Sequence, residues 1–346
     1  MKLASVLAAI VGLTLIGALV AHFGVSAVTR SLIAFGWTGF VIVCVIHLSL
    51  IVVMGMAWRA LLPGTPAWVP IWGRLIRDSG SEVLPLSQVG GYVLGARAVI
   101  FAGASGTAAT ASTIVDVTLE LFAQLAYTAL SLAWLLYLNP AAAVVIPIVV
   151  GLAAGVVLAA AFLGAQRRGF DLLDRLARVL GRGWTDKTSL GAAALHAALS
   201  DIYRRRARIW ISFSIHLACW VASTFEAWIA LRLATVPLTF STVLVIEGLL
   251  YAARSAAFAV PNAVGVQEGA YILLGAGFGL TPEMALALSL LKRARDLAIG
   301  VPALTACQLL ETGRIWRRAG SPRIDPPRNE TPVETTGVSA PVSWLR

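Results

Sequence analysis

The stretch PNAVGVQEG, at residues 261–269, interrupts a long apolar sequence and determines how the surrounding fold is interpreted. Proline lacks an N–H group and clashes with the preceding helical turn, so Pro261 is predicted to end a helix. Gly265 can adopt backbone conformations that other residues avoid, and Glu268 adds a charge to membrane-type sequence. We therefore expect a helix break at Pro261 and Gly265. The next helix is expected to begin with free N–H groups suited to an anion.

A second stretch of this kind, PLSQVGG, lies at residues 85–91 in the first half of the chain. Pro85, Gly90 and Gly91 are predicted to break the backbone here, so residues 83–104 are interpreted as a re-entrant or broken helix. Broken backbone at membrane depth is tolerated only where protein or water satisfies its polar groups. One broken element in each half of a membrane protein is the sequence pattern of a transporter site near the bilayer midplane.

The composition is that of a polytopic membrane protein. Hydrophobic residues make up 58% of the 346 residues and charged residues 13%, whereas a soluble domain has about 25% charged residues. A membrane-spanning helix needs about 20 predominantly apolar residues. The sequence thus predicts an all-α integral membrane protein with about eight spans, although the first could instead be a signal peptide. The predicted spans are residues 3–23, 38–62, 107–138, 140–164, 209–234, 240–260, 262–280 and 283–311.

The formal charge of +10 is concentrated in two stretches. Residues 165–208 contain ten basic and four acidic residues, and residues 313–346 contain six arginines and three acids. Basic residues are enriched in cytoplasmic loops, so both stretches and both termini are predicted to face the cytoplasm. Arg59, Arg74 and Arg77 are predicted to lie on the same side, after the second span. Because these clusters flank hydrophobic spans, we do not expect a nucleic-acid partner.

The domain organisation follows from the same patterns. Residues 1–312 are expected to form one transmembrane domain, with 165–208 as its basic cytoplasmic loop. Within that loop, residues 166–182 have the pattern of an amphipathic helix lying on the inner membrane surface. Residues 313–346 are rich in Pro, Arg, Thr and Ser and are predicted to be a disordered cytoplasmic tail.

Ionisable residues inside the predicted membrane domain are the candidate functional residues. Charges at membrane depth are costly, and they usually face a bundle interior or a water-filled cavity. Asp116 and Glu120 are four residues apart, so they share one helix face. Arginine is a better candidate than lysine for a phosphate contact, because its forked guanidinium group binds two oxygens. The candidate substrate-binding residues are Gln88, Arg97, Asp116, Glu120, Arg254, Asn262, Glu268, Arg293 and Asp296.

The arginines of this set are expected to contact a polar head group in one cavity where the two broken elements meet. The acids are expected to hold the arginines and to line the path. Purely structural pairing is the alternative, since breaking a buried ion pair costs about 3–5 kcal/mol. We expect no enzymatic activity, cofactor or metal site, because the sequence has no Walker loop, nucleophile elbow or zinc-protease motif.

The chain resembles the hopanoid-biosynthesis-associated integral membrane proteins of the HpnL kind. That group is similar to the flippase-like transmembrane region of lysylphosphatidylglycerol synthases. The resemblance covers residues 1–312 and is strongest in 84–125 and 247–304. The strings that carry it are LPLSQVGGYVLGARAV, ASTIVDVTLELFAQ, YAARSAAFAVPNAVGVQEGAYILLGAGFGL and ALALSLLKRARDLAIGVPAL.

The resemblance implies a multi-pass protein of the bacterial inner membrane that translocates or handles a membrane lipid: a hopanoid, another isoprenoid lipid or an anionic phospholipid. It also implies lipid-biosynthesis enzymes as candidate partners. Lysylphosphatidylglycerol synthases carry a soluble aminoacyl-transfer domain after the membrane part, and residues 313–346 are too few to form one, so lipid aminoacylation is not expected. Two alternatives stay open. One is an accessory scaffold that transports nothing, and the other is a membrane-embedded isoprenoid-lipid transferase using Asp116 and Glu120.

Overall fold

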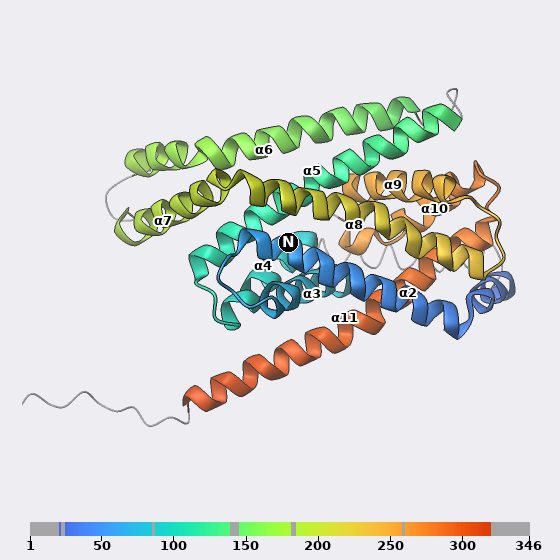
Figure 1. Ribbon diagram of the computed structural model, residues 1–346, viewed down its shortest axis with the longest axis horizontal. Coiled ribbons are helices and arrows are strands. Elements are labelled where there is room, and N and C mark those ends of the chain that lie inside the picture. The colour runs from blue at the N-terminus through green and yellow to red at the C-terminus, as the bar shows by residue number, and fades with distance from the viewer. Residues whose placement is uncertain are drawn as a thin grey trace, which may run out of the picture. The chain divides into compact units, whose positions relative to one another are not determined.

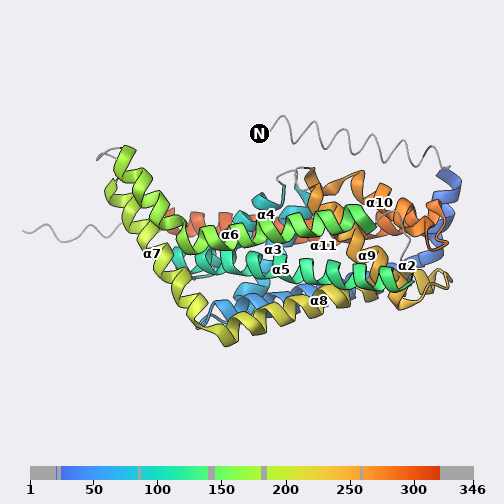
Figure 2. The same ribbon diagram turned by 90° about the horizontal axis from the view of Figure 1, so that it is seen from above.

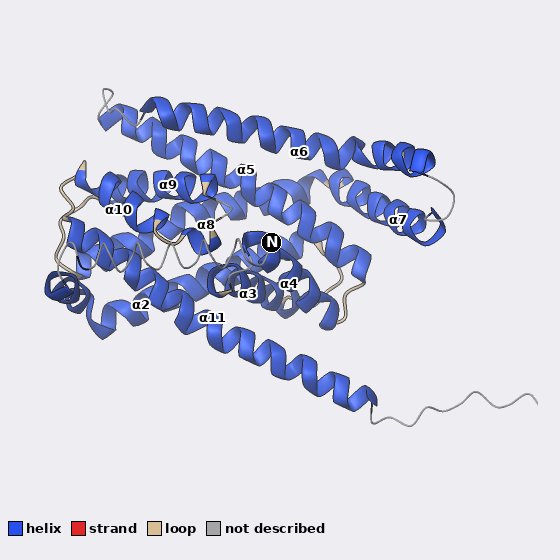
Figure 3. Ribbon diagram, turned by 180° about the vertical axis from the view of Figure 1, so that it is seen from behind, coloured by secondary structure: helices blue, strands red, loops and turns tan. Residues whose placement is uncertain are grey.

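A computed structural model of the chain describes residues 21, 25–84, 87–138, 145–180, 185–257 and 260–319. This part of the chain consists of helices and their connections and contains no strand (Figure 3). The all-α fold class is therefore confirmed. The elements are α2 (Val25–Leu61), α3 (Trp68–Val83), α4 (Ser87–Phe101), α5 (Gly106–Leu138), α6 (Val145–Leu180), α7 (Thr185–Arg204), α8 (Arg206–Leu233), α9 (Phe240–Ala256), the 3-10 turn η1 (Pro261–Ala263), α10 (Val266–Ala276) and α11 (Pro282–Ala319) (Figure 1).

Three described helices are long and apolar enough to cross a membrane: Val28–Leu61, Gly106–Leu138 and Arg206–Leu233. They overlap three of the predicted spans. Shorter apolar helical stretches lie at Val89–Phe101 and Val149–Gly164. The predicted first span, residues 3–23, lies outside the described residues except for Ala21.

Residues 165–180 and 185–204 of the basic stretch are helical. α6 packs along α5 and continues without a break to Leu180 (Figure 2). The predicted surface helix at 166–182 is thus the continuation of the preceding span rather than a separate element. α7 then forms the second part of the stretch and packs against α5 and α6.

The predicted boundary of the C-terminal tail is also corrected. α11 continues to Ala319, so residues 313–319 of the predicted disordered tail are helical. The remaining residues, 320–346, lie outside the described part of the chain.

Residues 68–101 form two short antiparallel helices, α3 and α4, which pack closely together. α3 has 16 residues and α4 has 15, so each is only about 23 Å long at 1.5 Å per residue. The hydrocarbon core of a bilayer is about 30 Å thick, so neither helix is long enough to span it upright. Leu84 is extended, and Pro85 lies outside the described residues. Gly90 and Gly91 do not break the helix, because α4 continues through both of them.

Gly91 instead permits the close approach of α3 and α4. A Cβ atom at this position would lie 2.0 Å from Ser81 Oγ and 2.5 Å from the carbonyl oxygen of Arg77. The second of these atoms belongs to the backbone and cannot rotate away, so a larger residue would push the two helices apart.

We expect Gly91→Ala to lower the free energy of unfolding by about 1–3 kcal/mol, the usual cost of overpacking a tight contact. The matched control is Gly164→Ala on α6, where a Cβ atom would meet no other atom within 4 Å. Denaturant unfolding of both purified variants in detergent measures the difference. Equal stability of the two variants would contradict the close contact.

The second predicted break is confirmed at residues 260–265. α9 ends at Ala256 rather than at residue 260, and the chain then passes through the turn η1. Asn262 has a φ of 49° and Gly265 a φ of 84°, both in the left-handed region that a continuing helix excludes. α10 begins at Val266 and has 11 residues, so it too is shorter than the bilayer core.

α8 occupies a central position, packing against α2, α5, α7 and α9. One apolar core joins α2, α8, α9, α10 and α11, and further clusters fill the spaces around α5. Large apolar side chains remain on the outer faces of α2 and α6, including Val41, Val52, Val157 and Leu158. Apolar side chains on the outside and charged side chains on the inside are the arrangement expected of a helix bundle in lipid.

Candidate functional site

Arginines of α3 and acids of α5 form one buried ion network. Arg77 Nη1 donates to Asp116 Oδ2 over 2.7 Å, and its Nη2 donates to Glu120. Arg74 donates to both carboxylate oxygens of Glu120, over 2.7 and 3.1 Å. His216 of α8 brings Nε2 within 2.9 Å of the other Asp116 oxygen. Asp116 and His216 are fully buried, so the protein itself must compensate the charge of Asp116.

Two predictions meet in this network. Asp116 and Glu120 do share one helix face, since both bind Arg77. Arg74 and Arg77, however, were predicted to lie on the cytoplasmic side of the second span. The side of the membrane stays a prediction, and the structure adds that both are buried in α3, with only a few per cent of each side chain exposed. Their spacing of three residues, which places them on one helix face, is the sequence signal that could have identified them.

A second buried network joins α2, α8 and α11. Glu226 of α8 accepts from Arg295, and the second Glu226 oxygen lies 3.1 Å from His47 Nδ1. Asp296 accepts from Arg295 over 2.5 and 3.0 Å. The predicted site residue Asp296 therefore holds an arginine, as expected, but the partner is its neighbour Arg295.

Glu247 of α9 is the centre of a third buried group. Lys292 donates to one of its oxygens over 2.6 Å, and the hydroxyl of Tyr271 donates to the other over 2.5 Å. Glu247 and Tyr271 are fully buried. Sequence reasoning placed these charges within the spans but did not include Glu226, Glu247, Lys292 or Arg295 among the site residues.

Glu268 closes the N-terminus of α10. One carboxylate oxygen accepts the backbone N–H of Gly265 over 2.7 Å. The other accepts from Ser289 over 2.9 Å and from Arg293 Nε over 2.5 Å. Glu268 is fully buried, so the anion at this helix end is the protein's own carboxylate. This corrects the expectation of free N–H groups open to an external anion.

The two interrupted elements meet, as predicted, between the end of α3 and the turn η1. Arg254 Nη2 lies 2.9 Å from both carboxylate oxygens of Glu82. The same nitrogen donates to Asn262 Oδ1 over 3.2 Å, and Asn262 Nδ2 donates to the Glu82 carbonyl over 2.6 Å. We call this group of three residues the break junction. Glu82 was not among the predicted site residues, although it lies beside the first break.

The predicted cavity at this place is nearly closed. The cleft lined by the break junction has a volume of about 10 Å³, room for about one water molecule. Glu82 and Arg254, which form the ion pair, both lie in the wall of this cleft. A group larger than water could therefore enter only if Glu82 and Arg254 separate.

Two further predicted residues lie elsewhere in the structure. Arg97 is on the exposed face of α4, with its guanidinium 5.2 Å from the ring centre of Phe101, rather than in the interior predicted for it. Gln88 lies in the first turn of α4, and its side chain is outside the described part of the chain.

A metal-binding cluster and a disulfide are both missing from the described part of the chain. Among the described residues, no three His, Cys, Asp or Glu side chains gather in a way that could hold a metal ion. The cysteines Cys44, Cys219 and Cys307 are free thiols. Asp116 and Glu120, the acids of the transferase alternative, are both engaged by arginines.

Comparison with known proteins gives one match. The profile of the family described as the lysylphosphatidylglycerol synthase TM region matches residues 3–303. No match was found among curated proteins or among solved structures. The matched range contains both breaks and every ion network described above, and the apolar helices agree with a membrane protein. The chain belongs to the family of the lysylphosphatidylglycerol synthase transmembrane region.

Proposed function

We propose that the protein translocates or otherwise handles a lipid in the bacterial inner membrane, and that the polar head group passes through the break junction. The observation that carries this proposal is the contact between Glu82, Arg254 and Asn262, which joins the interrupted elements of the two halves. Ionisable residues at membrane depth mark pathways and sites. Interrupted helices in corresponding positions of two halves are a recurring feature of transporter sites.

Arg254 of the break junction is chemically suited to exchange its carboxylate partner for a phosphate. Arg254 binds a carboxylate here, and a phosphate presents oxygens of similar spacing and charge to the same guanidinium group. The side chains of Arg254 and Glu82 are 13% and 27% exposed, whereas Asp116 and Glu247 are fully buried. An incoming anionic head group could thus replace Glu82 without leaving Arg254 unpaired.

The lipid class comes from the sequence resemblance. It favours a hopanoid or another isoprenoid lipid, with an anionic phospholipid as the alternative, and lipid-biosynthesis enzymes as candidate partners. The sequence contains no nucleotide-binding motif, so the proposed transport is passive or ion-coupled. The topology proposed from the basic stretches places both termini in the cytoplasm.

An accessory scaffold is the second candidate function. The observation that favours it is the completeness of the pairing: Asp116, Glu120, Glu226, Glu247 and Glu268 each bind a basic side chain. A buried pair can be purely structural, and such a protein would need no lipid to complete its interior. A scaffold should tolerate changes at the break junction that a transporter does not.

The test is a leaflet-exchange measurement with purified protein in liposomes that contain a fluorescent phosphatidylglycerol. We expect Arg254→Gln to slow exchange about 10–100-fold, because a charge-assisted hydrogen bond contributes about 1.5–3 kcal/mol. The charge-swapped variant Glu82→Arg, Arg254→Glu keeps an ion pair and should be stable, but it should not exchange lipid, because a carboxylate then occupies position 254, where the head group is proposed to bind. Arg232→Gln, an exposed change on α8, is the control. Exchange by the wild-type protein no faster than in empty liposomes would favour the scaffold.

A further inference from the structure

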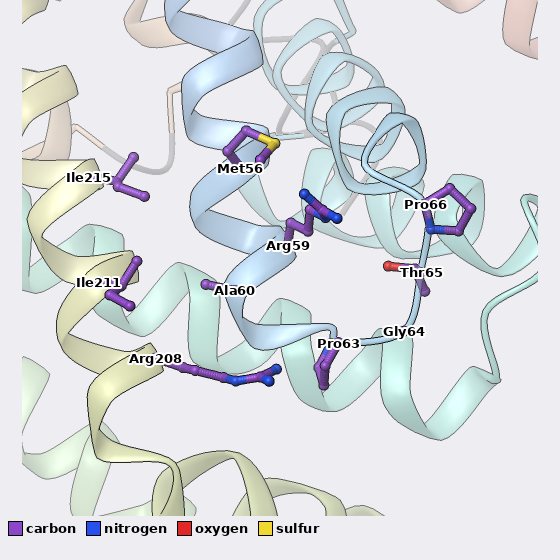
Figure 4. A pocket seen from close by; sticks show the side chains of 10 residues that line it. All are labelled: Met56, Arg59, Ala60, Pro63, Gly64, Thr65, Pro66, Arg208, Ile211 and Ile215. Carbon is purple, nitrogen blue, oxygen red and sulfur yellow. The ribbon is translucent and has the colours of Figure 1, made fainter.

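A second, open groove lies at the end of α2 and the beginning of α8, apart from the residues of the break junction. It has a volume of about 700 Å³ and includes Arg59, Thr65, Arg208 and Ile211 in its wall. Figure 4 shows the loop after α2 on one side and α8 on the other, with the Arg208 side chain extended toward Pro63. The volume is that of a site for a small molecule or for part of a lipid.

The groove carries two positive charges and no compensating acid. None of its lining residues is acidic. In the described part of the chain, neither the Arg59 nor the Arg208 guanidinium makes a hydrogen bond or an ion pair with a protein group. The nearby acid of α7, Asp201, is instead bound to Arg205 over 2.8 Å. Two such arginines in the wall of one groove favour an anionic ligand with several oxygens.

The rest of the groove is apolar. Met56 lies on α2, and Ile211 and Ile215 lie one turn apart on α8 above Arg208 (Figure 4). Ile211 is 52% exposed. Both helices are long and apolar enough to cross a membrane, so this apolar wall continues along the membrane-spanning surface of the protein.

Tryptophans indicate the depth of the groove in the bilayer. Trp210 follows Arg208 by two residues and is 65% exposed, and Trp68 follows the loop after α2 and is 55% exposed. Exposed tryptophans of membrane proteins gather at the level of the lipid head groups. The two arginines are therefore placed where lipid phosphates lie, and the isoleucines where acyl chains begin.

We propose that this groove binds an anionic phospholipid. Arg59 and Arg208 hold the phosphate between them, and one acyl chain lies along Met56, Ile211 and Ile215. The assignment is independent of the proposed function, because it uses no residue of the break junction or of the buried ion networks. A bound lipid would connect α2 to α8 at this end of the bundle.

The test titrates purified protein in detergent with dioleoyl phosphatidylglycerol and counts bound lipids by native mass spectrometry. We expect Arg59→Gln, Arg208→Gln to weaken binding about 30-fold, since each basic residue contributes about as much as it does at a charged membrane surface. The matched control is Arg30→Gln, Arg232→Gln, the same charge change at the opposite ends of α2 and α8. This control is expected to bind like the wild-type protein.

Further measurements distinguish a bound phospholipid from a free anion such as phosphate. Dioleoyl phosphatidylcholine should bind more weakly than phosphatidylglycerol, and Ile211→Gln should weaken binding of the dioleoyl lipid more than of a short-chain phosphatidylglycerol. Inorganic phosphate that displaces phosphatidylglycerol at equal concentration would show a free-anion site and overturn the lipid assignment. Equal losses in the two double-arginine variants would also overturn it, because the effect would then follow net charge rather than the groove.

Discussion

Replacing Arg77 by methionine is expected to lower the free energy of unfolding by about 3–5 kcal/mol, the cost of removing one partner of a buried ion pair. Arg77 is 2% exposed and binds both Asp116 and Glu120. Methionine keeps much of the side-chain volume, so the loss comes from the charge. Glu120 would keep Arg74, but Asp116, which is fully buried, would keep only His216. Denaturant unfolding of the purified variant in detergent measures this loss.

The control for this change is Arg232→Met on α8. Arg232 is exposed and lies 5.4 Å from the ring of Trp228, a contact worth about 0.5–1 kcal/mol. A double variant, Arg77→Met with Asp116→Asn, should recover part of the loss because it removes the uncompensated carboxylate. A loss in Arg77→Met as small as that in Arg232→Met would show that the network does not hold α3 against α5.

The ion networks differ in burial, so some of them should fix the conformation of the bundle while another is easier to open. α8 contributes His216 to the network around Asp116 and Glu226 to the network around Arg295. A shift of this helix would therefore disturb both networks together. The break junction, by contrast, is made by α3, α9 and η1 and is partly exposed. The break junction is thus less buried than the networks around Asp116 and Glu247, and it lies where the two halves meet.

Local sequence features predicted the elements of the fold that depend on local chemistry. Long apolar runs identified α2, α5 and α8, because a run of about 20 apolar residues is stable only in contact with lipid or with the protein interior. Pro261 and Gly265 identified the second break, because a missing N–H group and a positive φ act on the backbone where they occur.

The helix α3 was not predicted, because its sequence is too polar for a membrane-spanning helix. Its 16 residues include Arg74, Arg77, Asp78 and Glu82, which lower its hydropathy to that of a loop. Their partners lie elsewhere in the bundle, so their burial could not be recognised locally. Gly91 was misinterpreted for a related reason: it permits contact with a neighbouring helix, and a sequence alone does not show which glycines have a neighbour.

The acid and the base of each buried ion pair are far apart in the sequence. Arg77 and Asp116 are 39 residues apart, Glu226 and Arg295 are 69 apart, and Glu82 and Arg254 are 172 apart. Acids and bases in the predicted spans are nearly equal in number, which favours pairing between them. The sequence does not show which acid meets which base, because that depends on how the helices pack.

Glu268→Gln is expected to have the second large effect, lowering the free energy of unfolding by about 3 kcal/mol or more and abolishing lipid exchange. Glutamine is nearly the same size, but it carries no charge to balance Arg293, whose side chain is only 13% exposed. The other oxygens near Arg293 are the carbonyls of Asn262 and Ala263, at 3.4 and 3.5 Å, and these cannot replace a carboxylate. Unfolding in detergent and exchange in liposomes are the two measurements.

The double variant Glu268→Gln, Arg293→Gln separates a structural role of this pair from a functional one. Removing both charges removes the uncompensated arginine, so stability should return toward the wild-type value. Exchange should stay absent if Arg293, beside the second break, guides an anionic head group. If exchange returns together with stability, the pair only holds α10 against α11. In that case the break at residues 261–265 is a structural turn, and the scaffold interpretation gains the support that the transport proposal loses.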